Sequence, residues 1–208
     1  MRQRWLAGML TVTALSAAPL AQDRRIASPS GTAATEIRNR RNVADEVIPG
    51  SGKWMEITSG RPLRRGRDLW GSAADYGEML NDGAPVWRAG ANVSTRLKTE
   101  VPMVVGGKTV APGEYSLFIE LKPNRWTLIV SSWPAQTTGF DTQDTSALFG
   151  AFGYTAEKDV ARAPMMLRTL PVSIDQLTWG FADMSDAGGK LALMWDKTIA
   201  TVPFTVPR

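Results

Sequence analysis

Residues 113–130 read GEYSLFIELKPNRWTLIV, and this stretch decides the fold. Hydrophobic side chains alternate with polar ones on both sides of Pro123-Asn124, a dipeptide that turns the chain. A period of two residues is typical of a strand with one buried face. The stretch therefore predicts a β-hairpin, whose inward side chains are Tyr115, Leu117, Ile119 and Leu121 before the turn and Trp126, Leu128 and Val130 after it.

The same alternation recurs along most of the chain. Further strands are expected at 32–37, 54–57, 95–99, 177–181, 191–195 and 200–204, with a turn at 186–189. One short helix is expected over 72–80, with Ser72 as its cap and Asp75 in its first turn. Residues 39–47 fit either a short helix or a disordered insert. Short alternating strands separated by turns predict an all-β fold, specifically a single antiparallel β-sandwich, jelly-roll-like, with one short helix.

Composition limits the chemistry that the chain can perform. A hydrophobic fraction of 43% with 21% charged residues is ordinary for a globular domain of this length. The sequence contains no cysteine and no histidine. Disulfides, thiol nucleophiles, Ser-His-Asp triads and ordinary zinc sites are therefore excluded, because all of them need those side chains.

The N-terminus is typical of an export signal. Arg2 and Arg4 precede an apolar run, and small residues follow it at 16–18 and 19–21. We expect a signal peptide over 1–21, a loose N-terminal segment with a first strand over 22–52, and the β-sandwich domain over 53–208. Loss of the two signal arginines leaves a mildly basic chain, which does not imply a nucleic-acid partner. No later segment is apolar enough to cross a membrane.

Arginines and glycines gather between two of the expected strands. Arg61, Arg64, Arg65 and Arg67 lie around Pro62 and Gly66, and Trp87-Arg88 and Gly90-Ala91-Asn92 follow. Guanidinium groups suit carboxylates and phosphates, and glycine lets the backbone approach a ligand. The predicted ligand-binding residues are Arg61, Arg67, Trp87, Arg88 and Asn92. The alternative is structural: the arginines would bond internal acids and loop carbonyls, Trp87 would be core, and Asn92 would hold a turn.

Other motifs carry weaker signals. Asp141, Asp144 and Asp159 could include a carboxylate pair for glycoside hydrolysis, or be exposed loop acids. The oxygen-rich residues 141–145 could hold calcium but lack the EF-hand glycine and glutamate, so a polar loop is the better interpretation. Residues 105–108 read Val-Gly-Gly-Lys without the spacing of a phosphate loop, and a turn between strands is expected there. Asn92-Val93-Ser94 matches a glycosylation sequon.

Several motifs together resemble a bacterial family, domain of unknown function 2911. They are Ser59-Gly60-Arg61-Pro62, Arg65-Gly66-Arg67, Val86-Trp87-Arg88-Ala89-Gly90-Ala91-Asn92, and Gly106-Gly107-Lys108 through Phe118. Gly60, Ala89 and Val93 depart from the family pattern, and residues 38–52 look inserted. The resemblance covers most of the mature chain. It implies an exported, β-rich protein and brings no settled activity.

The expected function is a non-catalytic binding module of the cell envelope for an anionic or sugar-like ligand. No catalytic residue, metal ligand or cofactor is assigned. The alternatives are a carboxylate-dependent hydrolase, and a structural domain that docks on another envelope protein through a sheet edge. The expected location is the periplasm or the exterior of a bacterium.

Overall fold

The hairpin predicted from 113–130 forms the middle of a large antiparallel sheet. A computed structural model of the chain describes residues 27–207, and the expected signal peptide lies outside these residues. The described strands join in the order β1-β2-β3-β6-β7-β8-β9-β4-β5. Their bounds are β1 Ser30–Ile37, β2 Lys53–Gly60, β3 Thr95–Thr99, β4 Met103–Val105, β5 Lys108–Val110, β6 Gly113–Lys122, β7 Arg125–Ser131, β8 Asp159–Ser185 and β9 Gly188–Thr205.

The β6–β7 hairpin confirms the alternation pattern and adds a second buried face. Lys122 pairs with Arg125 across the turn, where Asn124 adopts a left-handed φ of 58°. Side chains such as Leu117 and Leu128 enter the main core, as expected. Phe118, on the opposite face, is also buried, because the loop that follows β7 packs over it. A strand buried on both faces gives a weaker alternation than one with a solvated face.

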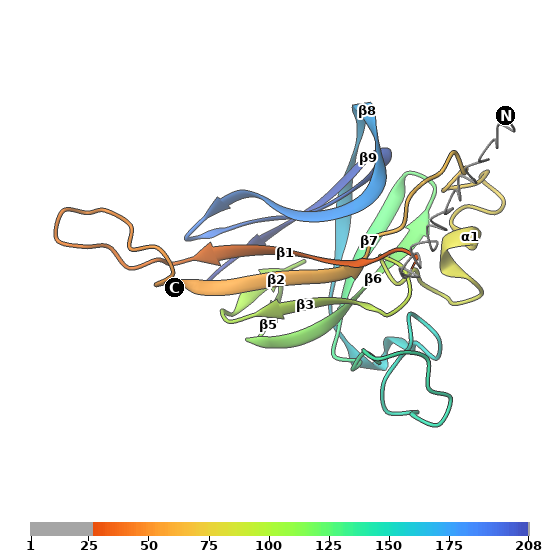
Figure 1. Cartoon of the computed structure of the whole chain (residues 1–208), viewed down its shortest axis with the longest axis horizontal. Coiled ribbons are helices and arrows are strands. Elements are labelled where there is room, and N and C mark those ends of the chain that lie inside the picture. The colour runs from red at the N-terminus through yellow and green to blue at the C-terminus, as the bar shows by residue number, and fades with distance from the viewer. Residues whose placement is uncertain (1–26, 208) are drawn as a thin grey trace, which may run out of the picture.

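Strands β8 and β9 form one long bent ribbon. The predicted turn near 186–189 closes it, with Ser185 opposite Gly188. The strands expected at 191–195 and 200–204 are one continuous strand, β9, in which Asp196 has a φ of 50° and pairs with Ile174. The ribbon bulges there, and the extra residues lie in β8, where Thr169 and Ile174 pair with Thr198 and Asp196. Bulges bend a strand and increase its twist. The ribbon consequently arches over β1 and β2 in the view of Figure 1.

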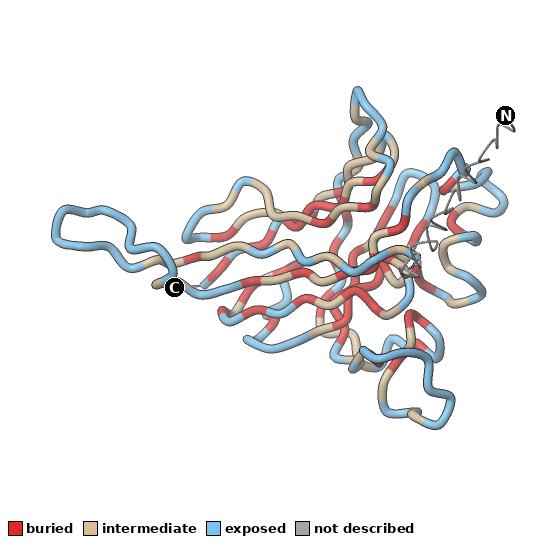
Figure 2. Tube along the Cα trace, viewed as in Figure 1, coloured by how far each residue is buried: buried red, intermediate tan, exposed pale blue. Residues whose placement is uncertain are grey.

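The curled sheet closes on itself just beyond β2. Residues 62–64 follow directly after β2 and run antiparallel to the second half of β8, with Arg64 N–H donating to Asp175 O over 2.7 Å and Leu177 N–H to Pro62 O over 3.0 Å. The residues of the main core lie between the two halves of the sheet (Figure 2), whereas the smaller buried cluster around Phe118 lies on the opposite face of β6 and β7. The all-β, antiparallel prediction is confirmed. The strands form one continuous sheet, so the sandwich or jelly-roll arrangement stays a prediction.

The helical content differs from the expectation. The described helices are the short α-helix α1, Glu78–Asn81, and a 3-10 turn, Ala156–Lys158. Residues 72–77 do not belong to α1, because Gly77 has a left-handed φ of 79° and interrupts the helical path. Ser72 caps a separate turn, in which its hydroxyl bonds to the Asp75 carboxylate. In the described part of the chain, no helix is long and apolar enough to span a membrane.

The segment before β2 is part of the sheet. The expected first strand is β1, which pairs with β2 along its whole length, from Ser30 opposite Gly60 to Ile37 opposite Lys53. Residues 38–52 form an exposed loop that projects from the body (Figures 1 and 2), and the helix considered for 39–47 is not present there. The Asn42 carboxamide oxygen accepts the Ala44 and Glu46 N–H groups at its tip.

Candidate functional site

A hollow of about 830 Å³ lies where the sheet closes. The backbone crossing at 62–64 forms its floor, and the chain leading into β1 forms one wall. Among the described residues that line it, three are arginines and none is acidic. The lining residues are Ala27, Ser28, Pro29, Arg61, Leu63, Arg65, Arg67 and Gln176.

Arg61 reaches from the end of β2 across to β8. Its aliphatic stem lies against Gly31 of β1, where an added Cβ would come within 2.5 Å of the Arg61 Cδ atom. Its Nε donates to Leu177 O over 3.2 Å and its Nη2 to Thr178 Oγ1 over 3.3 Å. These bonds tie β2 to β8, so Arg61 has a structural role. Within the described residues its Nη1 makes no hydrogen bond, and the guanidinium keeps donors for a ligand.

Arg67 folds back on the loop that carries it. Its Nε donates to Arg64 O over 3.0 Å and its Nη2 to Leu63 O over 2.6 Å. These bonds hold the loop in a fixed shape while the residue stays exposed. The second amino group, Nη1, has no partner among residues 27–207, so Arg67 can also donate to a ligand in the hollow.

Arg64 and Arg65 have different roles in this loop. Arg64 forms an ion pair with Asp196 over 3.2 Å and is only partly exposed. Arg65 has a left-handed φ of 51° and precedes Gly66, with a φ of 70°, so the chain turns sharply there. Its backbone N–H donates to Asp175, and its guanidinium bonds to no other described residue. Arg65 therefore lines the hollow as the arginine whose charge is least engaged.

Trp87 does not face the hollow. Its side chain is 1% exposed and stacks on Trp195, with ring centroids 6.0 Å apart and planes 15° apart. Its indole N–H donates to Gly90 O over 3.1 Å, which satisfies the buried donor. Trp87 is core, as the structural alternative predicted.

Arg88 is not among the residues that line the hollow either. It donates to Asn92 O over 2.9 Å and to the Asp82 carboxylate over 3.1 Å, and its guanidinium lies against Gly150. Asn92 instead supports the site, because its amide donates to the Ala27 and Ser28 carbonyls in the wall of the hollow over 3.1 and 3.3 Å. The structure thus brings Arg61 and Arg67 together, adds Arg65, and places Asn92 behind the wall.

A family model described as "Protein of unknown function (DUF2911)" matches residues 43–204, most of the chain. The chain belongs to the DUF2911 family. No curated protein and no solved structure matches it. The arginine loop, residues 61–67, lies inside the region matched to the DUF2911 model, whereas β1 and the wall at 27–29 precede that region.

The three aspartates considered for carboxylate chemistry in this DUF2911 protein lie in two separate places, Asp141 and Asp144 in one loop and Asp159 at the start of β8. Asp141 and Asp144 lie in the loop after β7, which the buried Gln136 holds by donating to both of their carbonyls. Hydrogen bonds from Ser146 lower the pKa of Asp144. Within the described residues, no three carboxylates group in a way that could hold a metal ion. The expected turn at 106–107 is present between β4 and β5.

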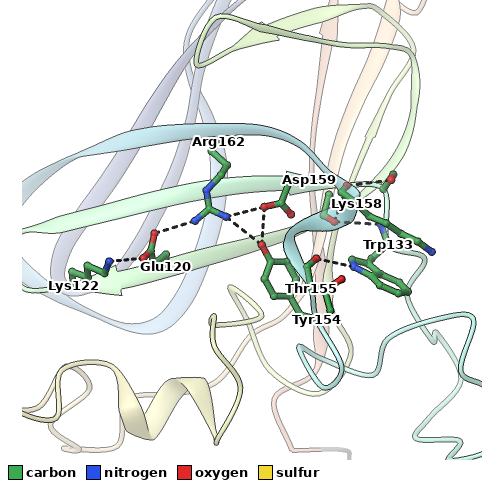
Figure 3. Close-up of polar contacts among 10 residues, drawn as sticks. Glu120, Lys122, Trp133, Tyr154, Thr155, Lys158, Asp159 and Arg162 are labelled. Carbon is green, nitrogen blue, oxygen red and sulfur yellow. Dashed lines mark hydrogen bonds and ion pairs between the residues drawn. The ribbon is translucent and has the colours of Figure 1, made fainter.

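Asp159 lies in a separate polar cluster (Figure 3). Its Oδ2 accepts a hydrogen bond from the Tyr154 hydroxyl over 2.7 Å and forms an ion pair with Arg162 over 2.8 Å. Arg162 also pairs with Glu120 over 3.0 Å, and Glu120 pairs with Lys122. Burial, and then the bond to Asp159, raises the pKa of Tyr154, so its phenol stays neutral. Each carboxylate in this cluster pairs with a cationic side chain, so the cluster has a structural role: it connects β6, β8 and the loop that carries Tyr154.

Proposed function

We propose that this DUF2911 protein is a non-catalytic binding module of the cell envelope that captures a small anion. The ligand would lie in the hollow and contact Arg61, Arg65 and Arg67. The observation that carries the proposal is that three arginines, and no acidic residue among residues 27–207, line this hollow. The periplasmic or secreted location rests on the signal-like pattern of residues 1–21.

The charge of the hollow favours an anion. Like charges that face one cavity repel each other, and an anionic ligand converts that repulsion into charge-assisted hydrogen bonds. Arg61 and Arg67 are fixed by their bonds to the backbone, so they lose little side-chain entropy when a ligand binds. Arg65 is exposed and would close on the ligand from outside. In this proposal the sheet is a jelly-roll-like scaffold that carries the binding loops at one end.

Calorimetric titration of residues 22–208 with inorganic phosphate and with citrate at low salt tests this function. We expect Arg65→Ala and Arg67→Ala each to weaken binding about 10- to 100-fold, since a hydrogen bond to a charged group contributes roughly 1.5–3 kcal/mol. The matched control is Arg125→Ala, at an exposed arginine of the β6–β7 turn. Equal affinity in all three variants, or no binding of either anion, would contradict the proposal.

A second candidate function is docking on another envelope protein. The loop 38–52 projects from the body and presents Val43 with an exposure of 110%, at a tip ordered by Asn42. An exposed apolar side chain on a loop of defined conformation is suited to bind in an apolar pocket of a partner protein. Pull-down from an envelope extract with the wild type and with Val43→Asp tests this candidate. We expect the wild type to retain a partner that the variant loses, and equal retention by both would contradict it.

A further inference from the structure

The outer face of β1, β2 and β3 carries one exposed indole, that of Trp54. Met55 and Ile57 of β2 point into the core, so Trp54 and Glu56 point to the opposite face. The register places Glu56 opposite Lys98 of β3. Trp54, Glu56, Lys98 and Glu100 line a hollow of about 230 Å³ on this face.

The polar groups around Trp54 are held in place and keep hydrogen-bonding capacity for a ligand. The Trp54 backbone N–H donates to Glu100 Oε2 over 3.1 Å, which orients that carboxylate beside the indole. Glu56 and Lys98 are cross-strand partners, yet neither side chain forms an ion pair or hydrogen bond with another described residue. The hollow therefore offers carboxylate acceptors and an ammonium donor around an apolar ring.

Trp54 also differs from Trp133, another partly exposed tryptophan. The Trp133 ring is covered by the Lys158 ammonium, 3.7 Å from its centroid, and its N–H donates to Thr155 O. Trp54 is 41% exposed, and its indole N–H has no acceptor among residues 27–207. An exposed tryptophan that lacks both kinds of internal contact presents a ring face and a donor to solvent.

We propose that this hollow, defined by Trp54, Glu56, Lys98 and Glu100, binds a neutral pyranose sugar. The C–H face of the sugar would stack on the indole, while its hydroxyls donate to the two carboxylates and accept from Lys98. Two carboxylates would repel an anion, and an apolar peptide would bury these charges without partners, at a high cost. The site needs a ligand that is uncharged and that can hydrogen-bond to the carboxylates while it packs on the indole. A sugar ring meets both requirements, because it combines an apolar face with hydroxyl donors and acceptors.

The proposal is independent of the arginine hollow. Trp54 and Arg61 are seven residues apart along β2 and its end, which corresponds to roughly 23 Å at the rise of an extended strand. The two sites also differ in charge, since no acid in the described part of the chain lines the arginine hollow, whereas two line the Trp54 hollow. Failure at one site therefore does not imply failure at the other.

Titration of ¹⁵N-labelled residues 22–208 with cellotetraose and with tetra-N-acetylchitotetraose, up to about 10 mM, tests the inference by NMR. We expect the Trp54 indole N–H signal to shift saturably with a Kd of about 1 mM, the affinity of a small site. Trp54→Ala should weaken binding at least tenfold and Glu56→Gln severalfold. Phe140→Ala, at an exposed aromatic on another loop, should bind as wild type.

The outcomes that overturn the inference are equally definite. A Trp54 indole signal that neither saccharide moves, in a protein whose spectrum shows it to be folded, refutes the site. Saccharide binding that survives in Trp54→Ala refutes it as well, since the stacking platform would be absent. Arg65→Ala should leave saccharide binding unchanged, and a loss there would place the sugar in the arginine hollow instead.

Discussion

Arg88→Ala tests whether the arginines outside the hollow stabilise the fold through carbonyls or through ion pairs. The side chain of Arg88 is 12% exposed, whereas that of its partner Asp82 is 66% exposed. An ion pair with so exposed an acid contributes about 0.2–1 kcal/mol. The bond to Asn92 O contributes about 1 kcal/mol, and packing against Gly150 adds a few tenths.

The expected loss of stability in Arg88→Ala is therefore about 2 kcal/mol, or roughly 4–8 °C in Tm for a domain of this size. Asp82→Asn removes the charge and suits the left-handed φ of 53° at this position, and it should cost no more than about 1 kcal/mol, because the Asp82 carboxylate is already largely solvated. Thermal unfolding followed by circular dichroism measures both variants. If Asp82→Asn lowers the Tm as far as Arg88→Ala does, the ion pair dominates and this reasoning is wrong.

Two further predictions concern the backbone and pH. Gly106→Ala should destabilise the protein by about 3 kcal/mol, because the new Cβ would lie 2.3 Å from Arg162 O. Gly107→Ala has open space around it and should cost only about 1 kcal/mol, for its left-handed φ. Similar Tm values for the two variants would contradict this reasoning. Burial raises the folded-state pKa of Tyr154 above its unfolded value of about 10. Its stabilising contribution is therefore complete below pH 10 and is lost as the pH rises further, so denaturant titrations should show a smaller alkaline loss of stability in Tyr154→Phe than in wild type.

The hairpin at 113–130 was predictable because its alternation and its turn agree. Each inward side chain meets the same core, and Pro123-Asn124 turns the chain where the pattern requires it. The short helix was misplaced because Ser72 and Asp75 form a local turn with the same residue types as a helix cap. Local side-chain hydrogen bonding and helix capping use the same residue types, so the sequence alone does not distinguish a turn from a helix start.

The candidate site was predictable only in part. The pattern identified Arg61 and Arg67, but the fate of each guanidinium depends on strands far away in the sequence, such as β8 for Arg61. Arg65 carries no special pattern, and its position in the hollow follows from the left-handed turn at Arg65-Gly66. Trp54 reads as one more alternating strand residue; only the packing of its neighbours shows that its face of the sheet is uncovered.

Closure of the sheet explains why scaffold and site are difficult to separate here. The crossing of residues 62–64 onto β8 both completes the fold and places the arginine loop beside residues 27–29. Substitution of Arg61 therefore disturbs the closure and the hollow together, and a loss of binding there would not discriminate between the two roles. Arg65 bonds the fold through its backbone and leaves its guanidinium unengaged by the described residues. It is consequently the arginine whose removal reports on ligand binding with the least effect on stability.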